Sequence, residues 1–321
     1  MRRIYLLGEC MVELSQTSGG LLKQSYAGDA YNTAVYLKRM FSEVQVNFFT
    51  TVGEDQLSDN MVTSFESEQI GTDLVFRAKD KAPGLYMIDT DDDGERSFTY
   101  WRECSAARQA MQFVTAEVVG QLCMGDVFFF SGISLAVIEP NDREIFWLLM
   151  RKLKDTGVKI AFDPNYRARM WKDKTEAKIQ FERAFRMADL VLPGIEDFTQ
   201  LYGFDDLSSI KKFCGAHGID ELIIKNGAKS VYCMSEQQVQ EIEISPVSGV
   251  VDTTSAGDSF NGGYMGARLQ GLSIADSVAV GATVAGFVIL HPGAIVPNQT
   301  FTKFNEQIIQ PALLNMAETC Q

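Results

Sequence analysis

Alternating apolar and polar positions in the first third of the chain predict β-strands. Residues 4–14 are expected to form a strand or a pair of strands, because Gly8-Glu9 separates two apolar runs. Residues 44–52 are rich in β-branched and aromatic side chains, which favours a strand. Residues 85–102 alternate around Asp93-Gly94, a dipeptide typical of hairpin turns.

From residue 127 onward, apolar strands alternate regularly with helical segments. Residues 127–131 are continuously apolar, as expected of a central parallel strand. The other segments with clear periodicity are strands at 159–162, 190–192 and 221–225, and helices at 57–69, 142–156, 174–187, 196–202 and after 208. Repeated βα units predict a doubly wound, mainly parallel sheet flanked by helices, with ligands beyond the carboxyl ends of its strands. We therefore predict one α/β domain over residues 1–321, in which two segments, roughly 9–28 and 83–104, form a small β-sheet lid.

A run of small residues near the C-terminal third is the strongest functional feature. Residues 249–263 pass from β-branched to small side chains and then enter a segment of helical spacing at 259–269. A small-residue loop before a helix directs backbone N–H groups at one point, where the helix dipole favours an anion. Asp258 lies beside that point. It is either a simple helix cap or a general base next to a transferable phosphate, and the length of the loop favours the base.

Composition restricts the classes of function. The chain has 321 residues, is 46% hydrophobic and carries a net charge of −13. This charge repels nucleic acids, and it requires local basic residues wherever an anionic substrate binds. Six cysteines without a C-x-x-C pair and only two histidines argue against a zinc site. With no run of ~20 apolar residues and no signal peptide in the N-terminal run, a cytoplasmic protein without a membrane partner is expected.

Two motifs together resemble the ribokinase-like (PfkB) carbohydrate kinase family. The late motif, residues 252–258 (Asp-Thr-Thr-Ser-Ala-Gly-Asp), is specific to that family, and the early one, Gly28-Asp29 to Asn32, accompanies it. Further segments look like the 2-keto-3-deoxygluconate kinases within the family: residues 8–14, 83–86, 98–102, 131–134 and 162–167. The resemblance implies phosphorylation of a sugar hydroxyl by ATP with Mg²⁺, and a small β lid over the sugar.

The resemblance also implies roles for individual residues. Asp258 would take the proton of the attacking hydroxyl, while the backbone N–H groups of Ser255, Ala256, Gly257 and Asp258 would hold the phosphate. The substrate would contact Gly28, Asp29, Asn32, Tyr86, Tyr100, Arg102, Arg167 and Asp258. The simpler interpretations are a turn with a helix cap for the early motif and solvated cross-strand pairs for the tyrosines. Arg102 matters most, since a guanidinium binds a carboxylate in bidentate fashion.

The nucleotide side is implied less specifically. Its residues are Asn165, Arg167, Lys225, Gly227, Ser255, Ala256 and Gly257, with a helix and turn at residues 282–294 beside the adenine. The simpler interpretation of Arg167 is a surface ion pair that contributes little energy, and Lys225 can equally be a solvated strand end. The family commonly has Asn-x-x-Glu at the position where this chain has Gly194 and Asp197. No side chain is therefore assigned to Mg²⁺, except Asp197 through water.

The resulting hypothesis is a homo-oligomeric kinase that phosphorylates 2-dehydro-3-deoxy-D-gluconate at its 6-hydroxyl. One alternative is a fructokinase or another sugar kinase of the same family. The alternative of another class is a non-catalytic sensor that binds nucleotide or sugar. The intact Asp258 and Ala256-Gly257 argue against the sensor.

Overall fold

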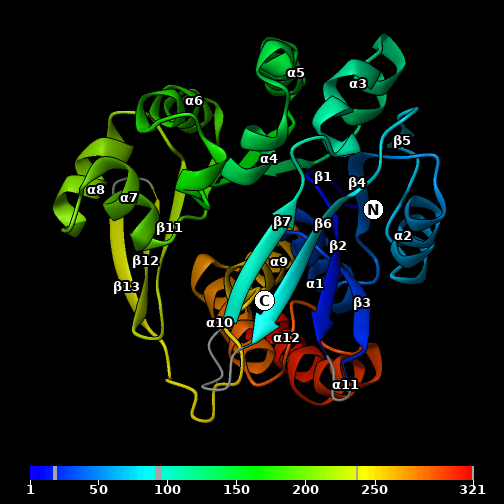
Figure 1. The fold of residues 1–321 in the computed structure, drawn as a ribbon. Helices are drawn as coiled ribbons and strands as arrows, with labels where there is room; N and C mark the ends of the chain where they lie inside the picture. Colours follow the sequence, from blue (N-terminus) through cyan, green and yellow to red (C-terminus); the bar gives the residue numbers. More distant parts are fainter. Residues whose placement is uncertain (17–19, 91–95, 236–237, 320–321) are drawn as a thin grey trace.

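A large mixed sheet forms the body of the protein, and a smaller sheet lies apart from it (Figure 1). The computed structural model describes residues 1–16, 20–90, 96–235 and 238–319. Within these residues the large sheet has the strand order β13 (Gln238–Glu243), β12 (Ser230–Ser235), β11 (Glu221–Asn226), β10 (Leu190–Val191), β9 (Lys159–Asp163), β8 (Val127–Ser131), β1 (Arg3–Leu7), β4 (Gln45–Val52) and β5 (Val75–Arg77). The pairs from β11 to β5 are parallel, whereas β12 and β13 are antiparallel.

Helices cover both faces of the large sheet, so its central strands are buried on both sides. In β1, Ile4 and Leu6 face one core and Tyr5 and Leu7 face the other. The first core is covered by α1 (Asp29–Met40), α2 (Gln56–Ser67), α9 (Ala256–Leu269), α10 (Ile274–Val288), α11 (Asn298–Phe304), η4 (Asn305–Ile309) and α12 (Gln310–Thr319). The second is covered by η1 (Ala106–Phe113), α3 (Ala116–Leu122), α4 (Gly132–Val137), α5 (Arg143–Asp155), η3 (Ala168–Met170), α6 (Lys174–Met187), α7 (Ile195–Tyr202) and α8 (Leu207–Gly215); the short η2 (Pro140–Asp142) connects α4 to α5. The predicted doubly wound, mainly parallel sheet is confirmed.

The small sheet has the order β3 (Leu22–Ala27), β2 (Met11–Gln16), β6 (Gly84–Thr90) and β7 (Arg96–Trp101). The strands β6 and β7 pair antiparallel, as predicted for a hairpin, while the expected turn at Asp93-Gly94 lies outside the described residues. The first predicted strand segment divides at Gly8 into β1 of the large sheet and β2 of the small one. The small sheet therefore comes from the two segments that were assigned to a lid.

The start of one helix and the presence of two strands differ from the sequence prediction in ways that matter for the site. The helix expected from residue 259 begins at Ala256, because Ser255 takes a left-handed conformation (φ 65°) that starts the helix directly after it. The antiparallel strands β12 and β13 were not among the predicted strands, although a mainly parallel sheet leaves room for them.

Glycines let α9 pack closely against α1. A Cβ added to Gly266 would lie 2.1 Å from a ring carbon of Phe41, and one added to Gly262 would lie 2.8 Å from the carbonyl oxygen of Thr33. Both distances are shorter than those at which a Cβ atom is found next to another heavy atom. The absence of side chains at these positions brings the N-terminal turns of the two helices together.

We expect Gly266→Ala to destabilise the protein by about 1–3 kcal/mol, the usual cost of overpacking a core. The matched control is Gly120→Ala in α3, where an added Cβ has open space. Alanine there should stabilise by up to about 1 kcal/mol through helix propensity. Urea unfolding of both variants measures the difference, and equal effects would contradict the packing argument.

Candidate active site

A cavity of about 910 Å³ lies between the small sheet and the carboxyl ends of the strands of the large sheet. It is lined by residues of the small sheet, by the N-terminal turns of α1 and α9, and by the segments after β9 and β11. It brings together all of the predicted site residues: Gly28, Asp29, Asn32, Tyr86, Tyr100, Arg102, Asn165, Arg167, Asp197, Lys225, Gly227, Ser255, Ala256, Gly257 and Asp258. These residues are far apart in the sequence, so it is the fold that brings them together around one cavity.

The N-terminus of α9 forms one end of the cavity. Ser255 is the N-cap, and the left-handed backbone there turns the chain into the first helical turn. Within the described part of the chain, the N–H groups of Gly257 and Asp258 donate to no other residue. Unpaired N–H groups at the start of a helix of 14 residues attract an anion.

Asp258 lies half-buried beside this helix start and has an unusual pKa. Its carboxylate accepts a hydrogen bond of 2.8 Å from the Asn32 side chain on α1. Burial, followed by the negative charges of Asp29 and Asp163, raises the pKa of Asp258 to about 7, although Asn32 and Lys225 oppose the shift. A carboxyl group with this pKa can exchange a proton with a ligand near neutral pH.

A buried polar network surrounds Asp258. Asp163, at the end of β9, accepts hydrogen bonds from Asn261 (2.6 Å) and from Lys225 (3.4 Å). Lys225 also donates to Asn261 at 3.0 Å. These hydrogen bonds hold the Lys225 ammonium group at the cavity wall, where β11 faces α9. Asp163 and Asn261 were not predicted as site residues, although Asp163 ends a predicted strand and Asn261 lies one helical turn after Asp258.

The early motif contributes the N-terminal turn of α1. Asp29 accepts a hydrogen bond of 2.9 Å from Asn165, whose backbone has a positive φ of 36°. Burial is the largest of the causes that raise the pKa of Asp29. Gly28 lies so close to the carbonyl oxygen of Glu9 that an added Cβ would be 2.1 Å from it. The motif therefore serves both the cavity and the packing of the backbone beside it.

Aromatic side chains of the small sheet line the opposite end of the cavity. The rings of Tyr86 and Tyr100 stack with centroids 5.5 Å apart, and the Tyr86 hydroxyl donates to the buried Glu13. This arrangement differs from the solvated cross-strand pair that was the simpler interpretation, because Tyr86 is only 6% exposed.

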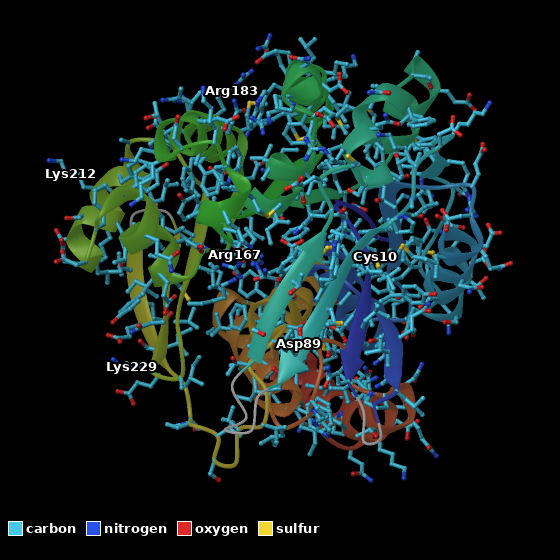
Figure 2. All side chains as sticks on the ribbon, in the orientation of Figure 1. Cys10, Asp89, Arg167, Arg183, Lys212 and Lys229 are labelled. Carbon is cyan, nitrogen blue, oxygen red and sulfur yellow. The ribbon has the colours of Figure 1, made fainter. Side chains whose placement is uncertain are left out.

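The arginines are arranged differently from the prediction. Arg102 lines the cavity, but its guanidinium forms an ion pair with the buried Glu9. Arg167, labelled in Figure 2 beside β7, lines the cavity and donates to the Tyr166 carbonyl at 3.1 Å. Arg169, which was not predicted, lies with its guanidinium carbon 3.8 Å from the centre of the Tyr100 ring. Arg102 and Arg167, both predicted to contact the substrate, thus line the cavity, and the charge of Arg102 is paired with Glu9.

Asp197 marks the place where a metal ion was considered. It accepts backbone hydrogen bonds from Tyr166 (2.7 Å) and Gly194 (2.8 Å), and burial followed by the charge of Asp163 raises its pKa to about 6. Among the described residues, no group of three side chains is suited to hold a metal ion. Asp163 and Asp197 fit a cation only if other ligands, such as phosphate oxygens and water, complete its coordination.

Gly227 and Lys225 flank the turn between β11 and β12. Gly227 has a φ of 56°, which glycine adopts without strain, and it lines the cavity. The helix expected at residues 282–290 is part of α10, and Ala282, Ala285 and Gly286 on it line the same region. No described helix is both long and apolar enough to span a membrane.

A helix start suited to an anion, beside the half-buried carboxyl of Asp258 in a doubly wound sheet with a small second sheet, is the arrangement of a class of phosphoryl-transfer enzymes. Residues 1–300 match the pfkB family carbohydrate kinases, and the chain belongs to this family. A 2-dehydro-3-deoxygluconokinase of Dickeya dadantii is 37% identical over 303 residues, which cover 92% of this chain and 97% of that protein. The enzyme of the same name from Escherichia coli K12 is 35% identical over 93% of this chain and 98% of its own length.

A solved structure agrees with the fold. The 2-dehydro-3-deoxygluconokinase of Thermotoga maritima superposes with a TM-score of 0.78 at 21% identity, covering 95% of this chain and 98% of that one. Membership of a kinase family supports ATP as the phosphoryl donor and a sugar as the acceptor.

The raised pKa of Asp258 predicts that kcat/KM increases with pH through about 7, because only the carboxylate can accept a proton. Because Asp258 interacts with Asp29 and Asp163, this rising limb of the pH profile reports the three carboxyl groups together. Asn32→Ala removes a hydrogen bond that favours the carboxylate and should move the limb to higher pH. Profiles from pH 5 to 9 test this, with Asn60→Ala on the exposed side of α2 as control. A limb that does not move in Asn32→Ala would refute it.

The same shift predicts a pH-dependent effect on stability. In an unfolded chain the pKa of an aspartate is about 3.9, so between this value and about 7 the folded protein binds more protons at Asp258. The contribution of Asp258 to stability therefore falls as the pH rises through this window. Asp258→Asn should be more stable than wild type at pH 8, by on the order of a few kcal/mol, with a much smaller gain at pH 4.5.

Urea unfolding at the two pH values measures this difference. Asp206→Asn is the matched control, because hydrogen bonds from Ser209 lower the pKa of that exposed helix cap. It should gain no stability at pH 8. An equal gain for Asp258→Asn at both pH values would argue against a raised pKa.

Proposed function

We propose that the protein phosphorylates 2-dehydro-3-deoxy-D-gluconate at its 6-hydroxyl with ATP, giving the 6-phosphate and ADP. The observation that carries the reaction is Asp258, a half-buried carboxyl with a pKa near 7, at a helix N-terminus whose N–H groups at 257 and 258 donate to no described residue. The substrate is supported by the two bacterial 2-dehydro-3-deoxygluconokinases that resemble nearly the whole chain.

In this reaction the sugar hydroxyl lies within about 3 Å of Asp258, the reach of a hydrogen bond. The carboxylate accepts the hydroxyl proton as the oxygen forms a bond to the γ-phosphorus. The bond from that phosphorus to the bridging oxygen breaks, and its electron pair leaves with ADP. The N–H groups of Gly257 and Asp258 stabilise the charge on the transferred phosphoryl group, as an oxyanion hole does.

The nucleotide occupies the part of the cavity next to β11 and α10. Lys225, fixed by Asp163 and Asn261, provides a positive charge for its phosphates, while Asn165 and Arg167 approach from the segment after β9. Gly227 and the small residues of α10 leave space for the base. Mg²⁺, when bound between the phosphates, neutralises their charge, and Asp163 and Asp197 are the carboxylates that would order its water shell.

The sugar lies between the early motif and the small sheet, with Asp29 and Asn32 on one side and Tyr86 and Tyr100 on the other. The small sheet then acts as a lid over it.

We also propose a cytoplasmic homo-oligomer. The assembly into an oligomer is supported by three exposed apolar side chains on the small sheet: Leu22 (51% exposed), Phe98 (39%) and Trp101 (56%).

A substrate panel tests the function. ADP release is followed with 2-dehydro-3-deoxygluconate, gluconate, fructose and ribose, for wild type and for Asp258→Asn. We expect the keto acid to give the highest kcat/KM, and the variant to lose about 10²–10⁴-fold in kcat.

Each alternative has a distinct outcome in this assay. Preference for fructose would identify a fructokinase. Binding of ATP and sugar without turnover would identify a sensor. Full activity of Asp258→Asn would remove Asp258 as the base.

A further inference from the structure

Three side chains from different elements form a ring of hydrogen bonds near the start of α9. Lys225 on β11 donates to the side-chain oxygen of Asn261 on α9 at 3.0 Å and to Asp163 on β9 at 3.4 Å. Asn261 donates to the same oxygen of Asp163 at 2.6 Å. Asn261 is completely buried, whereas the Lys225 side chain is 16% exposed and lines the cavity. The ring therefore connects the interior of the protein to the site.

We propose that the Lys225 ammonium group contacts the phosphoryl group while it is transferred, and that Asn261 is a positioning residue that keeps this ammonium group at the start of α9. The inference rests on the proposed function and deepens it, because it names the phosphate that Lys225 serves. It does not depend on which sugar accepts the phosphoryl group.

The position of the Lys225 nitrogen supports a contact with the transferred group. An added Cβ at Gly257 would lie 3.6 Å from this nitrogen. The ammonium group therefore faces the helix turn whose N–H groups at 257 and 258 donate to no described residue. An ammonium group has three N–H donors, and described residues accept hydrogen bonds from only two of those of Lys225. The third is left for an anion bound at the helix start.

Asn261 suits its place because an amide can both accept and donate. An ammonium group only donates and a carboxylate only accepts. The amide can therefore join Lys225 and Asp163 in one orientation, with its oxygen toward the lysine and its nitrogen toward the carboxylate. A neutral side chain that did only one of these would leave one of the two charges without its partner.

The amide also keeps the lysine and the carboxylate apart. Their direct contact of 3.4 Å is longer than the about 2.7–2.9 Å that is usual for a hydrogen bond between an ammonium group and a carboxylate. Without Asn261, we expect Lys225 to close on Asp163 and to move away from the start of α9. A charge displaced in this way stabilises the transition state less.

The test is a double-mutant cycle on Lys225 and Asn261. Wild type, Lys225→Met, Asn261→Ser and the double variant are assayed for kcat and for the KM of ATP and of the sugar, with the sugar that wild type phosphorylates best. Asn305→Ser is the matched control, because Asn305 donates to the Arg39 carbonyl at 3.0 Å and does not line the cavity. Urea unfolding measures the stability of each variant separately.

We expect Lys225→Met to lower kcat about 10²–10³-fold, the usual effect of removing one donor from a developing charge, with KM for ATP changed far less. Asn261→Ser should lower kcat by up to about 10²-fold, because it displaces a catalytic group. The double variant should be no slower than Lys225→Met, since Asn261 acts only through the lysine. Asn305→Ser should lose stability without losing kcat.

Two results would overturn the inference. Losses in kcat that multiply in the double variant would show that Asn261 does not act through Lys225. A raised KM for ATP with unchanged kcat in Lys225→Met would show that the lysine only binds the nucleotide.

If Asn261→Ser does not fold, Asn261→Asp decides, because it keeps the shape of the side chain. Its added carboxylate should hold the lysine and lower kcat, and an unchanged kcat would contradict the positioning role. A wild type that prefers another sugar would correct the proposed substrate and leave this inference standing. A wild type that phosphorylates no sugar would refute both.

Discussion

The close contact between α1 and α9 is the constraint on which the site depends. The helices can approach because glycines at 262 and 266 leave room for the backbone of α1 and the ring of Phe41. This approach places Asn32 within hydrogen-bonding distance of Asp258. This hydrogen bond favours the carboxylate and so opposes the desolvation that raises the pKa of Asp258. Helix packing therefore tunes the acidity of the group that we assign as the base.

Buried carboxyl groups also account for the distribution of positive charge around the cavity. Asp163 and Glu9 each hold one of the nearby cations, so charges that look available in the sequence are already engaged. Each of these pairs joins a buried carboxylate to a cation that lines the cavity. The cations that stay unpaired, Arg167 and Arg169, both follow β9. Which arginines are paired is therefore decided by the tertiary structure and not by the local sequence.

Local patterns in the sequence predicted the large sheet, and residues 255–258, which they singled out, line the cavity. The apolar run of β8 and the regular βα spacing are local signals, and the motif that ends at Asp258 lies within seven residues. The ion pair between Glu9 and Arg102 joins residues 93 positions apart, and no periodicity indicates such a contact. Arg169 was missed for the same reason, since its partner Tyr100 lies on another sheet. The start of α9 was misplaced because its N-cap, Ser255, adopts a left-handed backbone that is uncommon for serine.

The junction at Gly8 has a mechanical consequence. The chain passes from β1 to β2, from the large sheet to the small one, through only Gly8, Glu9 and Cys10. An added Cβ at Gly8 would meet Ala30 on α1 at 2.5 Å, and one at Gly28 would meet the Glu9 carbonyl. Any rotation of the small sheet must therefore twist these three residues against the first turn of α1. The connection between the two sheets is therefore stiff. Strain from a rotation of the small sheet would reach the turn that carries Asp29 and Asn32.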